Sequence, residues 1–508
     1  MTDVAVGIDV GTTNVKAVAV DAAGVLLARA SRPLTTSVAG EVAEQDAEAL
    51  WAAVADALRE VAVALPEGRG PATIGVCSQY SSIVPVDERC RPTGPLVTYL
   101  DTRGSDASWA IMERHPEAFG TWVERHGIPP VGGGLSLAHV LHLQADRERH
   151  GRTAAYLEPM DYVTSRMTGR IGATQATQFM GQVCDNRTVG HRSYDEDLLG
   201  MAGVDGSRLP PLLPLTGLAG ELLPEVAAEL GLAPGTEVRV GMNDSHAGAF
   251  ATGAFRPGGA GVMIGSTSVL LAPMDGLAVD LDHELLSMPA PLPDRYLLWA
   301  ENGMAGKVVE HVLGGLLLAG DELAPAPDVD PFAHLDAALL ASPAGANGLL
   351  FLPWLAGSLS PRADRDQRGS LVGLSLESRR VDVVRAAVEG VAHNLRWLLP
   401  AAEAFCGQAF TEIVLGGGAA RSDQWAQTLS DVLDRPVSVL AQPDSAAARA
   451  VALVALRLHM GEDPLEVDLP TASRFEPAPA AAEVHTRRHE AYLDAFDATR
   501  PLVERLSG

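Results

Sequence analysis

The chain has 508 residues, of which 47% are hydrophobic and 20% are charged. This balance excludes a disordered chain, and the length exceeds what one hydrophobic core usually supports, so we expect two domains. The formal net charge of −26 argues against nucleic acid as a partner, because an acidic surface repels phosphate backbones.

Nothing in the sequence indicates export, membrane insertion or a metal–thiolate site. The first residues, MTDVAVGIDVG, lack a basic region followed by a long apolar stretch, and no apolar run reaches the roughly 18 residues of a membrane span. The four cysteines (Cys77, Cys90, Cys184 and Cys406) form no CxxC pair. We therefore expect a cytoplasmic protein without a membrane partner, and we leave open whether it forms a homodimer.

The chain opens with a predicted strand, a tight turn and a second strand. Apolar residues 4–8 lead to Asp9, the turn follows at residues 11–14, and residues 15–20 are again mostly apolar. Residues 25–30 favour a third strand. Residues 47–65 carry apolar side chains at helical spacing, which predicts a helix that ends at Pro66. Strands that alternate with helices predict an α/β fold.

The first turn offers the chemistry of a phosphate site. Gly11, Thr12, Thr13 and Asn14 bring backbone N–H groups and hydroxyls to one point, and glycine lets an anion approach the backbone closely. Lys16 would add a positive charge, and Asp9 is placed to hold Mg²⁺ directly or through water. The alternative is a hairpin whose polar residues only satisfy the turn.

Asp244 stands at a predicted junction between a strand and a helix. An apolar segment ends at this aspartate, and small residues follow it. A carboxylate at the carboxyl edge of a sheet can accept a proton from a substrate hydroxyl. The alternative role is that of a helix N-cap, and the residue types do not decide between the two.

A second hydroxyl-rich turn repeats the first. Residues 261–271 align without gaps on residues 7–17, so that Gly265, Ser266 and Thr267 correspond to the first turn, while Met263 replaces Asp9. Such repetition predicts two domains of related design, which we place at residues 1–254 and 255–508. The alternative is chance similarity between two hairpins.

A third glycine cluster and a closing helix complete the pattern. The cluster Gly416, Gly417 and Gly418 follows an apolar strand and precedes a helix. A flat ring or a phosphate can lie against such a turn. The alternative is a turn that only connects the strand to the helix. This cluster lacks the GxGxxG spacing of a dinucleotide-binding turn. The chain also contains no GxxxxGK[ST] motif, so a P-loop nucleotide site is not supported. Residues 483–500 are expected to form the last helix, which Pro501 should end or kink.

Taken in order, these motifs resemble those of the FGGY carbohydrate kinases, over nearly the whole chain. The matching segments are GIDVGTTNVKAVAVD, SQYSSIVPVD, YLDTR, DYVTSRMTG, VGMNDSHAGAFATGA, IGSTS, FLPWLAGSLSP, RAAVEGVAHNLRWL and VLGGGAARSDQWAQTLSDVLDRPV. The resemblance implies two related ATPase domains of the actin/hexokinase/Hsp70 type, which is ribonuclease H-like, on either side of a cleft. It also implies ATP and Mg²⁺ as cofactors and a small sugar or polyol as substrate.

The resemblance and the residues together imply individual roles. Asp244 matches the family's catalytic base, and Asp9 lies near the metal. The positions expected to contact ATP or its phosphates are Gly11, Thr12, Thr13, Asn14, Lys16, Gly265, Ser266, Thr267, Gly306, Gly417, Gly418 and Ser422. The positions expected to line the sugar pocket are Gln79, Tyr80, Asp101, Arg103 and Asp244.

The substrate inferred from these motifs is a ketopentose such as D-xylulose. The elements SQYSS and DTRG look most like those of xylulokinase members, although the Gln-Met-His-Gly of many xylulokinases is missing. Gluconate, ribulose or another polyol remain alternatives within the family. The segment Gly357-Ser358-Leu359-Ser360-Pro361 replaces the Gly-Glu-Arg-Thr/Ser-Pro of many members. Because of this departure, a non-catalytic member of the family remains an alternative. The phosphate turns would also suit an actin- or Hsp70-like binding protein that is switched by nucleotide, which is a second alternative.

Overall fold

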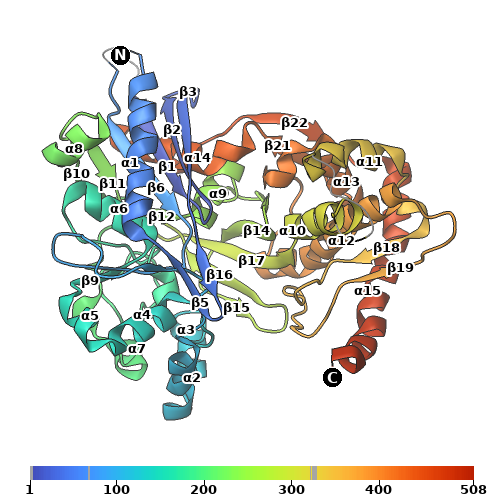
Figure 1. Cartoon of the computed structure of the whole chain (residues 1–508), viewed down its shortest axis with the longest axis horizontal. Helices are drawn as coiled ribbons and strands as arrows, with labels where there is room; N and C mark the ends of the chain where they lie inside the picture. Colours follow the sequence, from blue (N-terminus) through green and yellow to red (C-terminus); the bar gives the residue numbers. More distant parts are fainter. Residues whose placement is uncertain (1–3, 67–68, 321, 323–328, 508) are drawn as a thin grey trace.

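Two mixed β-sheets form the two halves of the protein. The computed structural model describes residues 4–66, 69–320, 322 and 329–507. Figure 1 shows the N-terminal half on the left and the C-terminal half on the right, and each half combines a sheet with helices. The α/β prediction is therefore confirmed.

The first sheet has seven strands, and β1 lies inside it. β1 pairs in antiparallel fashion with β2 and in parallel fashion with β6. The order across the sheet is β10 (Leu218–Glu221), β11 (Glu237–Arg239), β6 (Thr73–Ser78), β1 (Val4–Val10), β2 (Asn14–Asp21) and β3 (Leu26–Pro33), and β12 (Met242–Asn243) also pairs with β6.

The second sheet has eight strands and repeats this arrangement. β13 pairs in antiparallel fashion with β14 and in parallel fashion with β20. The order is β15 (Val279–Asp280), β16 (Leu285–Pro289), β17 (Tyr296–Met304), β14 (Thr267–Met274), β13 (Gly261–Ile264), β20 (Ile413–Gly417), β21 (Val437–Leu440) and β22 (Thr471–Phe475). Each half thus begins with a hairpin whose first strand has a parallel neighbour, as two domains of related design require.

The two hairpins differ in register by one residue. Asp9 faces Lys16 in the first hairpin, whereas Met263 faces Val269 in the second. The gapless alignment would have paired Met263 with Leu270, so it is wrong by one residue beyond the turn. The physical reason is turn length, because the Gly11 N–H bonds to the carbonyl three residues on, and the Gly265 N–H to the carbonyl two residues on.

Helices on the outer faces bury the apolar residues of both sheets. α1 (Ala47–Ala64) starts at Asp46, whose carboxylate accepts from the Glu48 and Ala49 N–H groups, and it buries Leu50, Val54 and Leu58 at helical spacing. These leucines and valines share one core with β1, β2 and β6. In the other half, α12 (Arg380–Cys406) and α13 (Asp423–Leu433) share a core with β13, β14 and β20.

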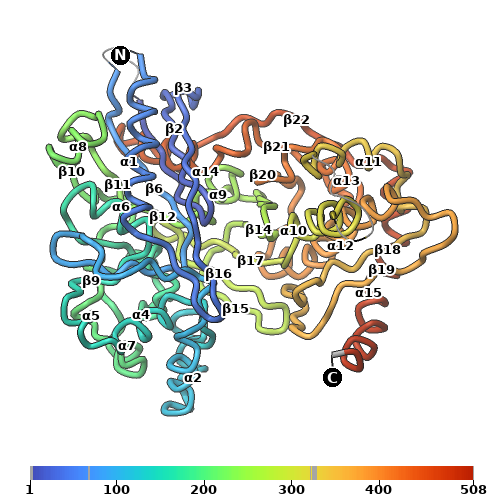
Figure 2. Tube along the Cα trace, in the orientation of Figure 1, coloured from blue at the N-terminus to red at the C-terminus, as the bar shows by residue number. Residues whose placement is uncertain are grey.

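α9 (Asp244–Thr252) and α14 (Ala446–Met460) pack against each other between the two sheets. Both belong to one core that also contains residues of β1 and β14. α14 crosses β1 and β6 closely, since a Cβ added to Gly7 would lie 1.8 Å from the Ala448 carbonyl oxygen. Figure 2 shows the orange trace of this segment against the blue strands of the N-terminal sheet. The last third of the chain is therefore part of the support of the first sheet.

The C-terminal helix differs from its prediction. α15 runs over Pro479–Ser507, so it begins earlier and continues past Pro501. Pro479 fits the first turn, where a missing N–H costs nothing. Pro501 removes one backbone hydrogen bond in a helix end whose neighbouring residues Arg500 and Leu502 are exposed, so water can satisfy the freed carbonyl.

Across the described residues, none of the helices has the length and apolar character needed to cross a membrane.

Candidate active site

Asp244 is the first residue of α9, directly after the short strand β12. Asn243 caps the helix, because its side-chain oxygen accepts from the His246 N–H at 2.7 Å. The N-cap role considered for Asp244 is therefore filled by Asn243. The Asp244 side chain is solvent-exposed. Desolvation by the surrounding protein is the main cause that raises its pKa to about 7, and the charge of Asp9 is the second. An exposed carboxylate with such a pKa is suited to exchange a proton near neutral pH.

Asp9 and Asp244 meet because their strands are neighbours. Asp9 pairs with Cys77 on β6, and Cys77 pairs with Met242, two residues before Asp244. Burial raises the pKa of Asp9, and Lys16 opposes that shift. The Lys16 Nζ lies 4.0 Å from the Asp9 carboxylate. Two neighbouring carboxylates with one ammonium leave a local negative charge, which a divalent cation would relieve.

Mg²⁺ fits this place without a dedicated protein cage. The described residues contain no group of three or more His, Cys, Asp or Glu side chains arranged to hold a metal ion. Mg²⁺ usually takes one or two protein carboxylates and fills its remaining positions with water and substrate phosphate oxygens. Asp9 retains 15% side-chain exposure, which allows such a contact.

The first turn is tied to the expected sugar pocket. The Thr12 hydroxyl donates to the Gln79 side-chain oxygen at 2.8 Å, and the Gln79 N–H donates to the Val10 carbonyl at 2.8 Å. The Gln45 amide donates to the Thr12 carbonyl at 2.7 Å. Residues 11–14 are therefore held by several hydrogen bonds, and the Asn14 amide donates to the Thr13 hydroxyl at 3.1 Å.

The second turn is braced by the start of α10 (Gly306–Glu310). The Ala305 and Lys307 N–H groups donate to the Ser266 carbonyl, and the Gly306 N–H donates to the Gly265 carbonyl at 3.0 Å. A Cβ on Gly306 would lie 2.1 Å from that carbonyl oxygen. Residue 306 must therefore be glycine for the turn at 265–267 to keep this position.

The third glycine cluster touches the same hairpin. Gly417 pairs with Ile264, has a φ of 80°, and a Cβ there would lie 2.5 Å from the Ile264 carbonyl oxygen. Gly418 follows in a short 3-10 turn. The Ser422 hydroxyl caps α13 by accepting from the Trp425 N–H and donates to Asp336, so this side chain has a structural role in the protein without nucleotide.

Tyr80 connects the acceptor side of the site to Asp244. The Tyr80 and Ser245 hydroxyl oxygens lie 3.3 Å apart, and Ser245 follows the proposed base. Desolvation raises the pKa of Tyr80, and Asp244 adds to this shift. The Tyr80 ring also meets the Trp299 ring edge-on, with centroids 6.4 Å apart. Tyr80 thus joins the two halves of the protein next to the carboxylate.

Asp101 and Arg103 bind mainly to each other. Asp101 is fully buried and accepts from the Ala43 N–H at 2.9 Å as well as from the Arg103 guanidinium. Burial alone would raise the pKa of Asp101, but the hydrogen bonds from Arg103 and from the backbone lower it overall. Arg103 also bonds to Glu44 at 2.5 Å. This pair supports the wall of the expected pocket, and its contact with a sugar stays a prediction.

The altered GSLSP segment is well anchored. Ser358 donates to the Arg362 carbonyl at 2.7 Å, and Ser360 donates to the Glu284 carbonyl at 2.8 Å. The Ser360 carbonyl accepts from the Asn302 amide at 2.9 Å. Serine hydroxyls with backbone partners therefore stabilise this segment.

Sequence reasoning missed residues that long-range pairing brings to the site. Gln45 contacts the first turn from β5 (Val42–Gln45), and Trp299 contacts Tyr80 from β17. In β17, Trp299 and Glu301 are partly exposed between buried residues, a pattern that the folded structure shows and the apolar sequence around Trp299 does not.

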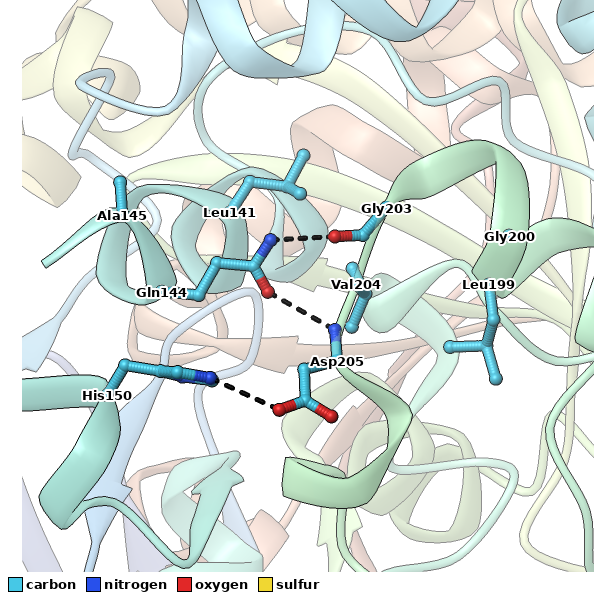
Figure 3. Close-up of a pocket in the computed structure, with 9 residues that line it drawn as sticks. All are labelled: Leu141, Gln144, Ala145, His150, Leu199, Gly200, Gly203, Val204 and Asp205. Carbon is cyan, nitrogen blue, oxygen red and sulfur yellow. Dashed lines mark hydrogen bonds and ion pairs between the residues drawn. The ribbon is translucent and has the colours of Figure 1, made fainter. Parts of the chain in front are cut away.

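A surface pocket elsewhere in the N-terminal half does not compete with this site. Figure 3 shows it between α4 (Ser136–Ala145) and α7 (Glu196–Ala202). Its polar groups already bond to one another, since the Gln144 amide donates to the Gly203 carbonyl at 2.8 Å and His150 lies 3.2 Å from Asp205. Little hydrogen-bonding capacity remains there for a ligand.

Comparison with known proteins identifies the family of the chain. The FGGY family of carbohydrate kinases matches with its N-terminal domain at residues 4–251 and with its C-terminal domain at residues 260–458. A xylulose kinase of Bacillus subtilis (strain 168) is 27% identical over 511 residues, covering 98% of this chain and 97% of the relative. A gluconokinase of the same organism is 27% identical over 449 residues, covering 86% and 84%. The crystal structure of a xylulose kinase from Rhodospirillum rubrum has a TM-score of 0.83 at 26% identity, covering 99% of this chain and all of that one. The protein therefore belongs to the FGGY family of carbohydrate kinases, enzymes that transfer a phosphoryl group to an alcohol.

Proposed function

We propose that this kinase transfers the γ-phosphoryl group of ATP to a hydroxyl of a small ketose, with D-xylulose as the first substrate to test. The observation that carries the proposal is the position of Asp244, a solvent-exposed carboxylate with a pKa raised to about 7 that lies beside Asp9 and the first turn. Xylulose and gluconate are the substrates named for similar proteins, and the residues SQYSS and DTRG favour the ketose.

The proposed reaction is a direct displacement. The acceptor oxygen forms a bond to the γ-phosphorus, the bond between that phosphorus and the β,γ-bridging oxygen breaks, and ADP leaves. Asp244 takes the proton of the attacking hydroxyl. The backbone N–H groups of residues 12–13 and 266–267 stabilise the negative charge of the transferring group, since those of Gly11 and Gly265 already close their own turns. Bound Mg²⁺, held through Asp9 and water, would supply further charge neutralisation.

Domain placement serves the same purpose in this proposal. The first turn and Asp244 belong to residues 1–254, while the second turn, Gly306 and Gly417 belong to residues 255–508. Closure of two such halves on their ligands would exclude water and limit hydrolysis of ATP.

A coupled assay of ADP release tests the proposal. The purified protein is given ATP and Mg²⁺ with D-xylulose, D-ribulose, D-gluconate, glycerol or xylitol, and phosphorylated product is identified by mass. We expect acceptor-stimulated ADP release matched by an equal amount of sugar phosphate. If no acceptor raises ADP release above the rate without sugar, the kinase proposal fails, and the non-catalytic alternative replaces it.

A further inference from the structure

Glu301 is a carboxylate of the C-terminal sheet that the proposed reaction does not yet use. It lies on β17, a strand whose other side chains are almost all buried, and it is itself only partly buried. No hydrogen bond or ion pair joins its carboxylate to another residue within the described ranges. Partly buried acids without a partner cost free energy, so the ligand is the natural candidate to satisfy this one.

The strand pattern places Glu301 on the side of the sheet that faces Asp244. Val269 and Glu301 are directly paired, and Met263 pairs with Val269. Met263, Val269 and Trp299 pack against the same core as Tyr80 and α9. Trp299 and Glu301 are two residues apart in one strand, so their side chains share a face.

α9 lies against this same row of side chains. A Cβ on Gly248 would lie 3.3 Å from Met263, and Gly248 stands one helical turn after Asp244, hence on the same face of the helix. Strands are spaced about 4.8 Å apart, so Glu301 lies roughly 10 Å across the sheet from Met263. A five- or six-carbon acceptor can span the space between these positions.

Glu301 is also held in place by its neighbour. Asn302 is the extra residue where the pairing of β14 with β17 shifts, and its amide donates to the Ser360 and Asn394 carbonyls at 2.9 and 3.1 Å. The Asn394 amide in turn donates to the Asn302 carbonyl at 2.6 Å. A bulge anchored in this way fixes the direction of the adjacent side chain.

Charge around Glu301 indicates which acceptors fit. Burial raises the pKa of Glu301, and the nearby Glu284 raises it further, so this region already disfavours negative charge. Of the two cations expected at the site, Arg103 is bonded to Asp101 and Glu44, and Lys16 lies next to Asp9. A sugar acid would bring its own carboxylate among these groups, whereas neutral hydroxyls can donate to them.

We infer that Glu301 recognises the acceptor by accepting hydrogen bonds from the hydroxyls of an uncharged ketose or polyol, and that it selects against sugar acids such as gluconate. Trp299 forms the apolar wall beside it. This inference rests on the proposed kinase function and adds the substrate class.

The test compares kcat/KM for D-xylulose, D-ribulose, xylitol and D-gluconate in the wild type, Glu301→Gln and the control Glu377→Gln. Glu377 is an exposed acid of the same half. We expect wild type to favour an uncharged acceptor over gluconate by at least about tenfold. Loss of hydrogen bonds to a charged group should reduce kcat/KM of Glu301→Gln for that acceptor by about 10- to 100-fold, while the KM for ATP stays unchanged. The control should match wild type.

Three results would overturn the inference while the kinase function stands. The first is a wild-type preference for gluconate, which is measured without any variant. The second is a Glu301→Gln enzyme with unchanged kcat/KM for the acceptor. The third is a Glu301→Gln enzyme whose main defect is a raised KM for ATP, which would assign the residue to the nucleotide. If no acceptor is phosphorylated by wild type, both the inference and the proposed function fail.

Discussion

The two strand–turn–strand units of the protein are built alike but differ in chemistry. The first carries Asp9 and Lys16 in paired positions, and the second carries Met263 and Val269 there. The first turn is bonded to the Gln79 side chain, and the second is bonded to the backbone at the start of α10. One framework thus carries two kinds of chemistry: the N-terminal copy places charged side chains at its turn, and the C-terminal copy places a turn held by backbone hydrogen bonds. In the proposed reaction, the first would serve the metal and the second the phosphates.

The largest effect should come from Asp244, which acts next to the charged turn. Asp244→Asn removes the proton acceptor but keeps the shape of the side chain. Loss of a general base typically costs about 100- to 10,000-fold in rate, so we expect kcat to fall within that range while ATP still binds. Turnover and nucleotide binding are measured on the same preparation. Near-normal turnover would remove Asp244 from its role.

The pH profile of the wild type sharpens this prediction. The base must be deprotonated to act, and the pKa of Asp244 is raised to about 7. kcat/KM for the acceptor should therefore rise with pH below about 7 and level off above it, by roughly tenfold per pH unit on the acidic limb. Residual activity of Asp244→Asn should lack this limb.

The next effect distinguishes the first strand–turn–strand unit from the second by its metal requirement. Asp9→Asn should raise the Mg²⁺ concentration needed for half-maximal activity by about 10- to 100-fold, since a direct or water-mediated contact to the cation is lost. Asp9 also raises the pKa of Asp244, so the acidic limb should move to lower pH. The matched control is Met263→Leu, which changes the corresponding position and should leave the Mg²⁺ requirement unchanged. Equal effects of both substitutions would mean that the copies do not differ in metal binding.

A smaller effect probes the rigid backbone of the second copy. Gly306→Ala places a Cβ 2.1 Å from the Gly265 carbonyl oxygen, so the turn must move. We expect kcat/KM for ATP to fall by about tenfold, because small displacements of positioning groups are costly. Gly276→Ala is the control, since a Cβ there would have no heavy atom within 4 Å. An equal loss for Gly276→Ala, or no loss for Gly306→Ala, would contradict a positioning role of the second turn.

The smallest effect concerns Ser422, which was expected to contact nucleotide. Its hydroxyl caps α13, so Ser422→Ala should lower the free energy of unfolding by about 1 kcal/mol. The KM for ATP should change little, and thermal unfolding with and without ADP measures both quantities. A normal stability combined with a strongly raised KM would instead support the predicted contact of Ser422 with nucleotide.

Local sequence patterns predicted the framework because they reflect short-range physics. Alternation and turn residues located β1, β2 and β13, and helical spacing located α1. The same reasoning failed where a single residue or a distant contact determines the local structure. The shorter second turn shifts the register, Asn243 and not Asp244 caps α9, and α15 continues through Pro501.

The missed part of the site lies in pairings between distant segments. Trp299 meets Tyr80 across the two halves, and Glu301 lies directly opposite Val269 only because β17 lies beside β14. Asp101 and Arg103 were expected to line the pocket, but no local pattern reveals that they bond to each other. Such contacts depend on how distant segments pack in the folded protein, and residue spacing along the chain does not predict them.

The most direct test of the central claim is a crystal structure with a non-hydrolysable ATP analogue, Mg²⁺ and the best acceptor. We predict that the β- and γ-phosphates lie between residues 11–13 and 265–267, with an acceptor hydroxyl within hydrogen-bonding distance of the Asp244 carboxylate. Phosphates bound away from either turn, or an acceptor that does not reach Asp244, would contradict the account.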